Sequence, residues 1–480
     1  MSFSAVPSRE LSPRGRTIVL STCLVSVVVA GLDTTIANVA LPSIQKALHA
    51  PLSGLQWVVD AYTLVIACLL MFSGSVADRF GRRRVFQVGL GLFSLGSLLC
   101  GLAPSLGALV AFRALQAVGG AMLNPVAMSI IAATFTDSKE RARAVGAWGA
   151  VAGLSGAVGP VLGGLLVSGL GWRSIFWVNV PVGALAIYLT QRFVPESKAA
   201  RGKRFDPLGQ LLVIAFLGPV TAAVIEGPRY GWSSPFIIAL FVLAAAAVAG
   251  LIATESRCAE PLVDIRVFRS PAFSGAAIIS VIALMSLSGF LFLNTLYLQD
   301  VRGYSALHTG LLLFPMAAAM AACAMISGRI AVTRAARPAF VLAGLLLAAG
   351  TGLLLGTGHG TGSWYLVLAY LLFGAGFGLV GTPLTNTALS GMPRDQAGVA
   401  AAIASTCRQT GGAVGVAVSG SIVAGGSAGF IASSHTAWTF LTGCGIATAL
   451  LALLSTGRWA RTQAERSARR SSTHALEATR

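Results

Sequence analysis

Charged side chains are scarce in this chain. Only 10% of its 480 residues are Asp, Glu, Lys or Arg, whereas a soluble domain carries about 25% of these residues. The composition is 55% hydrophobic, and long apolar runs recur from end to end. Runs of about 20 such residues are long enough to cross a bilayer as helices. We therefore expect a polytopic membrane protein without a separate soluble domain.

Patterns typical of catalytic and metal sites are also lacking. The seven cysteines are scattered without metal-ligand spacing, and the five histidines fall in or near expected loops. A membrane-embedded enzyme would need clustered His and carboxylates, or a Ser/His pair at one depth. We therefore expect neither catalysis nor a cofactor. The net charge of +18 is compatible with nucleic acid, but the distribution of that charge argues against such a partner.

Basic residues are present in number, and their positions predict a topology. Hydropathy indicates fourteen spans, at about 17–40, 54–76, 84–103, 106–128, 142–168, 173–193, 207–226, 235–254, 272–298, 306–331, 338–357, 363–385, 396–421 and 436–456. With these spans, 28 of the 34 basic residues fall in segments on one side, four on the other side and two within spans. Short loops rich in Arg and Lys stay in the cytoplasm. Both termini are therefore expected inside the cell.

The loop between the second and third spans concentrates this charge. It reads Gly74-Ser-Val-Ala-Asp-Arg-Phe-Gly-Arg-Arg-Arg-Val-Phe86. The two glycines would let the helix ends and the turn pack closely. Any short inner loop needs basic residues, which explains its last three arginines equally well, but the aspartate between the glycines is more specific. We interpret five residues as a candidate cytoplasmic gate: Gly74, Asp78, Arg79, Gly81 and Arg82.

Four ionisable residues fall inside expected spans, where each costs at least about 2.5–3.5 kcal/mol near mid-bilayer. Asp33, Asp60 and Arg113 are expected at one depth, roughly 10 Å from the outer helix ends at about 1.5 Å per residue. The functional interpretation is a carboxylate that exchanges protons while Arg113 tunes its pKa, and the structural alternative is a static ion pair. Asp60, near the outer end, could instead be solvated. Arg408 lacks an evident acidic partner, so backbone carbonyls or substrate would meet it.

A stretch of small residues occurs twice in the sequence. Ser155-Gly-Ala-Val-Gly-Pro-Val-Leu-Gly-Gly164 aligns with Gly411-Gly-Ala-Val-Gly-Val-Ala-Val-Ser-Gly420 at an offset of 256. Two further landmarks recur near this offset, namely Pro125 with Pro383 and Gly74 with Gly328. A shared offset for three segments predicts parallel repeats of six helices with two helices inserted between them. Ordinary tight packing would explain any one of these glycines taken singly.

Several of these stretches together resemble the fourteen-helix drug:proton antiporter branch of the major facilitator superfamily. The loop at 74–86 is similar to the superfamily's signature between helices 2 and 3. Residues 32–42, 57–64, 113–120, 155–164, 172–181 and 408–412 look like motifs of that branch in helices 1, 2, 4, 5, 6 and 13. Ser155 stands where the helix 5 motif usually has glycine. The surroundings of Glu226, itself expected to be solvated, are similar to bacterial antibiotic exporters of the methylenomycin-resistance type.

The resemblance implies an all-α membrane protein with the major facilitator fold, two six-helix bundles plus two inserted helices. The expected units are a cytoplasmic tail at 1–16, a bundle at 17–193, a linker with two helices at 194–270, a second bundle at 271–456 and a basic tail at 457–480. The resemblance also implies that Arg113 takes part in proton coupling, while the charges inside the spans point to Asp33 as the proton carrier and to Asp60 as the next candidate. Asp78 would close the inner gate by binding a facing helix N-terminus of the other half through the helix dipole.

The implied activity is export of antibiotics or other hydrophobic toxic compounds by alternating access, driven by the proton gradient. The antiporter motif would comprise Ser155, Gly159, Pro160, Gly163 and Gly164, and a possible substrate cavity Asn38, Tyr62, Asn294 and Arg408. Expected partners are a small hydrophobic or amphipathic substrate, protons and the lipid bilayer, with a monomer in the bacterial cytoplasmic membrane. The alternatives are a specific metabolite exporter or uptake permease and, more remotely, a membrane-embedded enzyme or sensor.

Overall fold

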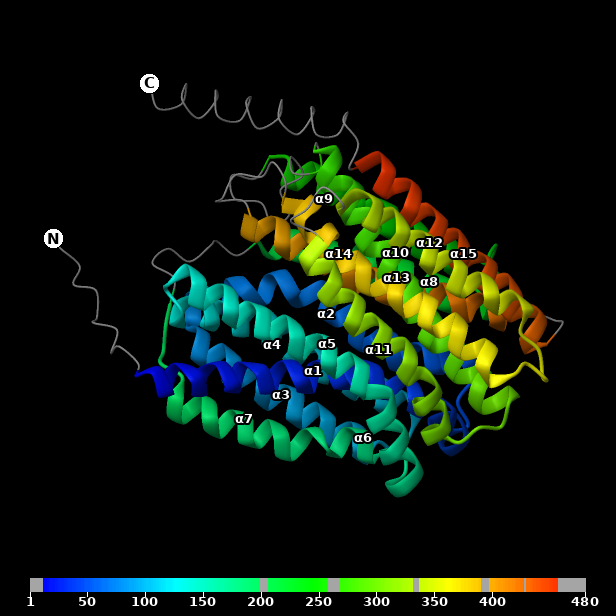
Figure 1. Cartoon of the computed structure of the whole chain (residues 1–480), viewed down its shortest axis with the longest axis horizontal. Coiled ribbons are helices and arrows are strands. Elements are labelled where there is room, and N and C mark those ends of the chain that lie inside the picture. Colours follow the sequence, from blue (N-terminus) through cyan, green and yellow to red (C-terminus); the bar gives the residue numbers. More distant parts are fainter. Residues whose placement is uncertain are drawn as a thin grey trace.

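The structure is a computed structural model that describes residues 12–198, 206–257, 268, 270–330, 336–389, 397–426 and 429–455. These residues form helices and the connections between them, with no strand in the described part (Figure 1). The first helices are α1 (Pro13–Leu48), α2 (Leu52–Phe80), α3 (Arg82–Leu102), α4 (Leu106–Thr134), α5 (Ser138–Leu170), α6 (Ser174–Trp177) and α7 (Asn179–Phe193). Next come α8 (Pro207–Tyr230) and α9 (Pro235–Glu255).

The second half of the chain begins with α10 (Pro271–Leu296), which continues into the π-helical segment η2 (Tyr297–Val301). It then has α11 (Ala306–Ile330), α12 (Ala336–Leu353) with the 3-10 turn η3 (Leu354–Gly356), α13 (Ser363–Leu389), α14 (Ala397–Ala424) and α15 (Phe430–Ser455). The predicted tails, most of the linker and the loops at 331–335 and 390–396 lie outside the described residues.

Four of these helices begin with the same two-residue signal, a Ser or Asp followed by Pro. The pairs are Ser12-Pro13, Asp206-Pro207, Ser234-Pro235 and Ser270-Pro271. Each capping oxygen accepts a hydrogen bond from a backbone N–H of the first turn, for example from Gly209 N at 2.8 Å in α8. Proline suits the first helical position because the N–H that it lacks would have no helical partner there. The pair occurs at the start of both α1 and α10, as expected for corresponding helices of a repeat.

The predicted fold class is confirmed. Thirteen helical segments of the described chain are long and apolar enough to cross a membrane, with α6 and α7 counted as one. α14, which has 28 residues and carries the charged Arg408, is not among these segments and corresponds to the expected span at 396–421. One expected span, 173–193, is interrupted at Val178 between α6 and α7. Pro181 explains the break, because it has no N–H to donate to the carbonyl group of Trp177.

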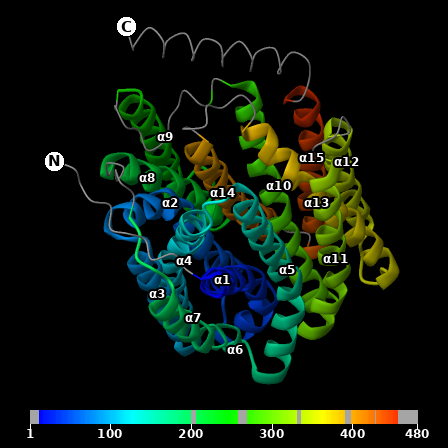
Figure 2. The same ribbon diagram turned by 60° about the vertical axis from the view of Figure 1, so that its left-hand side comes forward.

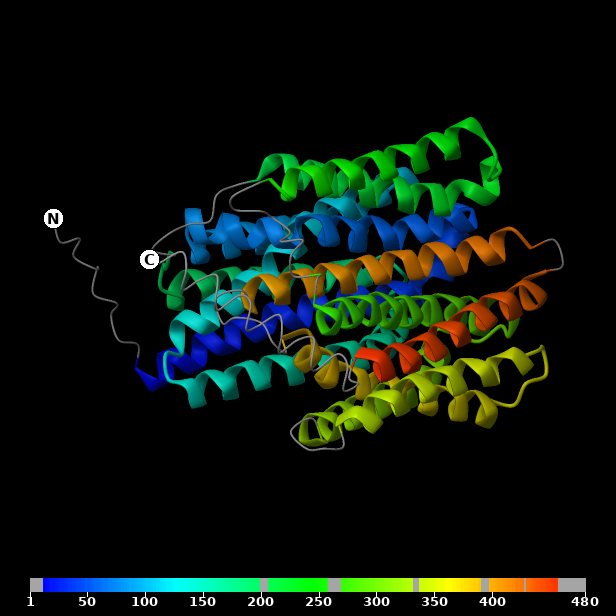
Figure 3. The same cartoon turned by 90° about the horizontal axis from the view of Figure 1, so that it is seen from above.

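The helices form two bundles with a helix pair at the edge. α1–α7 make up the N bundle and α10–α15 the C bundle (Figures 1 and 2). α8 and α9 form a hairpin at the periphery, and α8 packs against α2 of the N bundle and α14 of the C bundle (Figure 3). The polar link at one end of α8 is a 2.7 Å hydrogen bond from Gln210 Nε2 to the Cys68 carbonyl oxygen.

The two ends of the molecule differ in how closely the bundles approach. We call the end with the α2–α3 turn the basic end and the opposite one the far end. The face of α5 that looks toward α11 is marked by Gly164, Gly156 and Gly149. A Cβ added to Gly164 would lie 2.6 Å from the Ala306 carbonyl oxygen, and one added to Gly156 would lie 3.9 Å from the Met320 methyl group. A Cβ added to Gly149 would meet no neighbouring atom within 4 Å. Along the seam between α5 and α11, the bundles therefore touch at the far end and separate toward the basic end.

Candidate functional site

Asp33 of α1 and Arg113 of α4 form an ion pair inside the N bundle. Arg113 Nη1 lies 2.6 Å from Asp33 Oδ2, and the two side chains are 1% and 2% exposed. Burial of both charges is unfavourable in itself, so the pair depends on its short distance and on further hydrogen bonds. The sequence placed these residues at one depth, and the structure brings them into direct contact.

Two amide side chains complete the surroundings of the carboxylate. Gln116 Nε2 donates to Asp33 Oδ1 at 2.7 Å and Asn179 Nδ2 donates to the same oxygen at 3.1 Å. Both amides also donate to Ser97 Oγ of α3, at 2.6 and 3.1 Å. A guanidinium group only donates, so the Gln116 atom at 2.8 Å from Arg113 must be its oxygen, which fixes the amide orientation. Every described hydrogen-bond partner of Asp33 is therefore a donor, as an ionised carboxylate requires.

The guanidinium of Arg113 is held on several sides. Its Nε donates to the carbonyl oxygen of Val58 in α2 at 3.1 Å. The centre of the guanidinium lies 4.2 Å from the ring centroid of Tyr62 and 5.7 Å from that of Phe176. Arginine stacks favourably on aromatic faces, most strongly where water is excluded. These contacts tie α1, α2, α4 and α6 together around one charge.

Glycines in α3 and α4 allow this arrangement. A Cβ on Gly96 would lie 2.5 Å from Gln116 Cα, and a Cβ on Gly119 would collide with the backbone N of Phe93. The two helices therefore approach closely enough for Ser97 to reach the Gln116 amide. Gly119 belongs to the stretch that resembles the fourth-helix motif, and its role here is to permit close packing.

Asp60 of α2 is separate from this network. Its side chain is 0% exposed, so the solvated alternative is wrong. Thr63 Oγ1 donates to Asp60 Oδ1 at 3.4 Å, while Oδ2 has no hydrogen-bond partner within the described residues. Asp60 is thus a second buried carboxyl group, with no cation beside it in the described part of the chain.

The possible cavity residues lie in different environments. Asn38 is 5% exposed and donates to the Thr34 carbonyl oxygen, and Tyr62 is 1% exposed beneath Arg113. Asn294 is 0% exposed and accepts a 2.7 Å hydrogen bond from the Tyr370 hydroxyl. Arg408 is only partly buried, and its Nη2 donates to Ser405 Oγ at 2.8 Å on its own helix. Of the four, Arg408 is the one with charge and partial exposure, while the other three are buried in bundle packing.

The antiporter-motif residues pack α5 against its neighbours. Ser155 lies beside Gly31 of α1, because a Cβ added to that glycine would be 3.0 Å from the Ser155 side chain. Gly159 meets Thr35, and Gly163 would place a Cβ 3.2 Å from the Ile36 Cα. Gly164 faces α11 in the C bundle, where Gly310 in turn faces the Pro160 carbonyl. This stretch therefore joins α1 on one side and the C bundle on the other.

The α2–α3 turn depends on Glu196, a residue outside the motif at 74–86. Asp78 Oδ1 accepts from Arg82 Nη2 at 3.0 Å within the turn. Gly81 has φ +111°, and a Cβ there would lie 2.6 Å from Glu196 Oε1. Glu196 Oε1 accepts from the Arg83 backbone N at 3.1 Å and so caps α3, where the helix dipole favours an anion.

Two expectations about the turn have different outcomes. A Cβ on Gly74 would meet no atom within 4 Å, so Gly74 does not serve close packing in this conformation. Arg79 is exposed and lies 5.9 Å from the Phe80 ring. The hydrogen bond given for Asp78 lies within the turn, and the loops at 331–335 and 390–396 lie outside the described residues, so the gate stays a prediction.

Some site residues were not singled out from the sequence. Gln116 and Asn179 lie inside the stretches 113–120 and 172–181 that carry the resemblance, which was the available signal. Ser97 had no signal, because serine is common in apolar helices. Glu226 was expected to be solvated, but it accepts a 2.9 Å hydrogen bond from Trp57 Nε1.

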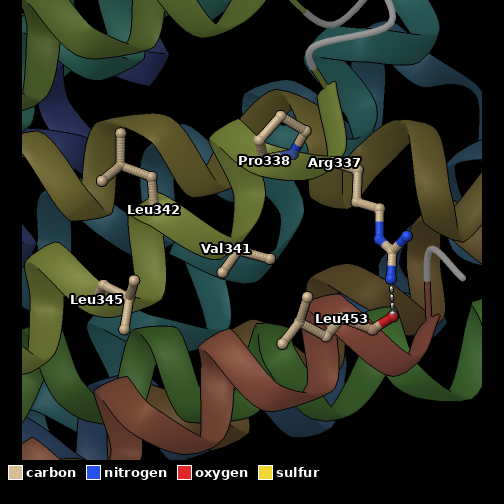
Figure 4. Close-up of a pocket in the computed structure, with 6 residues that line it drawn as sticks. All are labelled: Arg337, Pro338, Val341, Leu342, Leu345 and Leu453. Carbon is tan, nitrogen blue, oxygen red and sulfur yellow. Dashed lines mark hydrogen bonds between the residues drawn. The ribbon is translucent and has the colours of Figure 1, made fainter.

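A surface groove of about 320 Å³ lies far from this site. It is formed by α12 and α15 of the C bundle, and Arg337 Nη2 donates across it to the Leu453 carbonyl oxygen at 3.3 Å (Figure 4). Leu342 and Leu345 in its wall are 48% and 53% exposed on the outside of the bundle. Exposed leucines on a spanning helix face lipid, so we do not assign the groove to transport.

Comparison with known proteins identifies the family. The profile of the Major Facilitator Superfamily matches residues 23–212 and 207–416. The chain belongs to this superfamily. It is 41% identical over 395 residues to the Multidrug resistance protein Stp of Mycobacterium tuberculosis, covering 82% of this chain and 73% of that protein. It is 34% identical to the Methylenomycin A resistance protein of Streptomyces coelicolor, covering 82% and 83%.

The fold of this superfamily member is also found in solved structures. The D-xylose-proton symporter superposes with a TM-score of 0.66 at 14% identity, covering 91% of this chain and 97% of that one. At this identity the likeness concerns the fold alone. The relatives named for drug resistance confirm the resemblance to drug-efflux members, and members of the superfamily are transporters rather than enzymes.

Proposed function

We propose that this protein exports antibiotics or other small hydrophobic or amphipathic toxic compounds in exchange for protons. It would do so by alternating access in the cytoplasmic membrane of a bacterium, with the basic end and both termini inside. The observation that carries this proposal is the buried Asp33–Arg113 pair, which places a titratable carboxyl group inside the N bundle. The names of the relatives support the substrate class.

Asp33 would carry the coupling proton. In the present arrangement all its described partners donate hydrogen bonds, which suits the carboxylate form that would follow release of the proton. Protonation would remove the attraction to Arg113 and present an O–H with no acceptor, so the network must rearrange when a proton binds. This requirement links the charge of one side chain to the packing of α1 against α4.

The conformation agrees with the direction of exchange. Along the seam between α5 and α11, the helices lie closer at the far end than at the basic end, which supports a state that is closed at the far end. If the basic end faces the cytoplasm, the ionised Asp33 corresponds to the state after proton release inside the cell. The emptied site would then take up substrate from the cytoplasm or the inner leaflet, and proton binding from outside would complete the cycle. Asp60 is the next candidate for coupling, because it is also a buried carboxyl group.

The nature of the substrate follows from what lines the two halves. Within the described spans of the C bundle, the one carboxylate is the exposed Asp300 at the far end, and the centre is aromatic. A divalent cationic drug would lack a second anionic partner there, so a neutral or singly charged compound fits better. Arg408 is placed to meet a polar group of such a compound.

Two interpretations compete with this proposal. The ion pair could be static and only stabilise the bundle, or the protein could be a permease specific for one metabolite. Both can be tested in everted membrane vesicles from bacteria that overproduce the chain, with a fluorescent probe of the pH gradient. The test compounds are methylenomycin A, ethidium and a panel of common metabolites. Export predicts that a toxic compound collapses part of the gradient, whereas a response to metabolites alone would favour the permease. No response to any compound, with the protein shown to be present, would contradict the proposal.

A further inference from the structure

Two buried glutamines connect the N and C bundles at the far end. Gln56 of α2 donates from Nε2 to the carbonyl oxygens of Ala417 at 2.8 Å and Val416 at 3.3 Å, both in α14. Gln299 of η2 donates in the opposite direction, from Nε2 to the carbonyl oxygen of Val39 in α1 at 2.8 Å. The two side chains are 0% and 8% exposed. Each bundle therefore sends one amide into the main chain of the other.

We infer that Gln56 and Gln299 form a reciprocal clasp that holds the far end shut and sets how readily it opens. This inference rests on the alternating access of the proposed function, but it concerns different residues and a different end from the proton site. Both glutamines would be positioning residues, since they touch only the protein. The clasp would break and re-form once in each transport cycle.

The local structure fits each glutamine to its task. α10 changes to π-helix at Tyr297–Val301, which adds a residue to the turn and alters the direction of the side chains that follow. The Tyr297 hydroxyl anchors this segment by donating to the Gly358 carbonyl oxygen at 2.7 Å. Gln299 thereby faces α1 across the seam, close to Pro42, which interrupts the hydrogen-bond ladder of α1.

Gly420 makes room for the other glutamine. A Cβ at this position would lie 2.6 Å from Gln56 Cδ, so any side chain would displace the amide from the two carbonyls. Gly420 is the last residue of the second small-residue stretch in the sequence. Its counterpart in the first stretch, Gly164, packs α5 against α11 at the same end. The two copies thus close the two sides of one seam.

Physical chemistry explains why glutamine suits a bond that must break. A helical carbonyl oxygen keeps a second lone pair after accepting its helical bond, so the amide adds a contact without disturbing α14 or α1. A neutral hydrogen bond contributes far less free energy than a buried ion pair costs to separate. Gln56 Oε1 has no partner within the described residues, so water that enters on opening would satisfy the whole amide.

The test measures the far end directly and needs no substrate. Spin labels are placed at Leu170 of α5 and Trp364 of α13, which are both 74% exposed at the far end of different bundles. The labelled protein carries no other cysteine and is reconstituted in nanodiscs. The distance distribution then reports the ratio of open to closed far ends. Methionine replaces glutamine, because it has similar length and no donor.

In the Gln56→Met/Gln299→Met variant we expect the ratio of open to closed far ends to rise about tenfold, with a smaller rise in each single variant. The matched control is Gln210→Met. Gln210 also is buried, donates to a main-chain carbonyl at 2.7 Å and has an unpaired Oε1 in the described structure, but its bond joins α8 to α2 and does not cross the seam. The control should leave the ratio unchanged.

An unchanged distance distribution in the double variant would overturn the clasp, and so would an equal shift in Gln210→Met. If the methionine variants fail to fold, as judged by size-exclusion chromatography, Gly420→Ala decides. It should raise the ratio of open to closed far ends relative to the wild type, because its added Cβ displaces the Gln56 amide from both carbonyls. No opening in Gly420→Ala would contradict the inference. A shift in distances without export of any compound would retain the clasp and refute the proposed function instead.

Discussion

The N and C bundles have the same architecture but opposite chemistry at their centres. Arg113 lies seven residues after the start of α4 at Leu106, and Tyr370 lies seven residues after the start of α13 at Ser363. The N-bundle residue forms an ion pair with Asp33, whereas Tyr370 donates a neutral hydrogen bond to Asn294. The same position in a repeated helix therefore holds a charge in one half and an aromatic ring in the other.

The surroundings follow the same division. In the C bundle, Phe290 stacks on Phe373 with ring centroids 4.0 Å apart and meets Tyr370 and Trp438 edge-on. Such a cluster is stabilised by the burial of apolar surface and by the geometry of the ring contacts, and neither depends on pH. In the N bundle the corresponding space is filled by hydrogen bonds that depend on the ionised form of Asp33. The proposed function therefore predicts that the N bundle responds to protons while the C bundle keeps its shape.

The largest effect is expected when the ion pair loses its cation. Arg113→Ala leaves the Asp33 carboxylate buried with amide donors alone, so the free energy of unfolding should fall by about 3–5 kcal/mol and transport should stop. Thermal unfolding in detergent and the vesicle assay measure the two effects. In the double variant Asp33→Leu/Arg113→Met the protein should regain stability but not transport. If the double variant were as unstable as Arg113→Ala, the loss would not come from the unpaired charge.

A smaller effect is expected when the network loses one amide. Gln116→Leu removes the donors to Asp33 Oδ1 and Ser97 and the acceptor for Arg113, at a cost of about 1.5–3 kcal/mol for hydrogen bonds to charged groups. Because the lost donor stabilises the ionised carboxylate, transport should shift its pH optimum upward relative to the wild type. A full pH profile in vesicles checks this. A lower rate with the same profile would assign Gln116 to packing alone.

The smallest effect is expected in the aromatic centre. Tyr370→Phe removes the hydrogen bond to Asn294 and leaves the ring packing, so it should cost about 1 kcal/mol of stability. Transport and its pH profile should remain as in the wild type, because no titratable group in the described structure depends on this bond. A changed pH profile in Tyr370→Phe would show that the C bundle takes part in proton coupling.

The sequence was sufficient for the fold and for the central pair. Apolar runs and the distribution of arginine predicted the helices, and the cost of burying charge pointed to Asp33 and Arg113 before any contact was known. The partners Ser97 and Asn179 could not be predicted from hydropathy, because they depend on the rotation of α3 and α7 about their axes. Gly96 fixes the rotation of α3, because it allows that face of α3 to approach α4 closely.

Other features depend on contacts between distant segments. Asp60 was compatible with a solvated position, since counting residues from a helix end does not show which neighbours cover a side chain. Glu226 meets Trp57 only because the inserted α8 packs against α2. The break at Val178 was predictable in principle from Pro181, whereas the capping of α3 by Glu196 follows from the position of the chain after α7.

The most direct test of the central claim uses purified protein in liposomes with an imposed pH gradient. The compound that responds in vesicles is supplied, and its accumulation is followed for wild type and Asp33→Asn, with Asp60→Asn as the comparison. Asparagine keeps the shape of the side chain but cannot bind or release a proton. We predict that Asp33→Asn still binds the compound and equilibrates it, but no longer accumulates it against its gradient. Accumulation by Asp33→Asn at the wild-type rate would contradict the account.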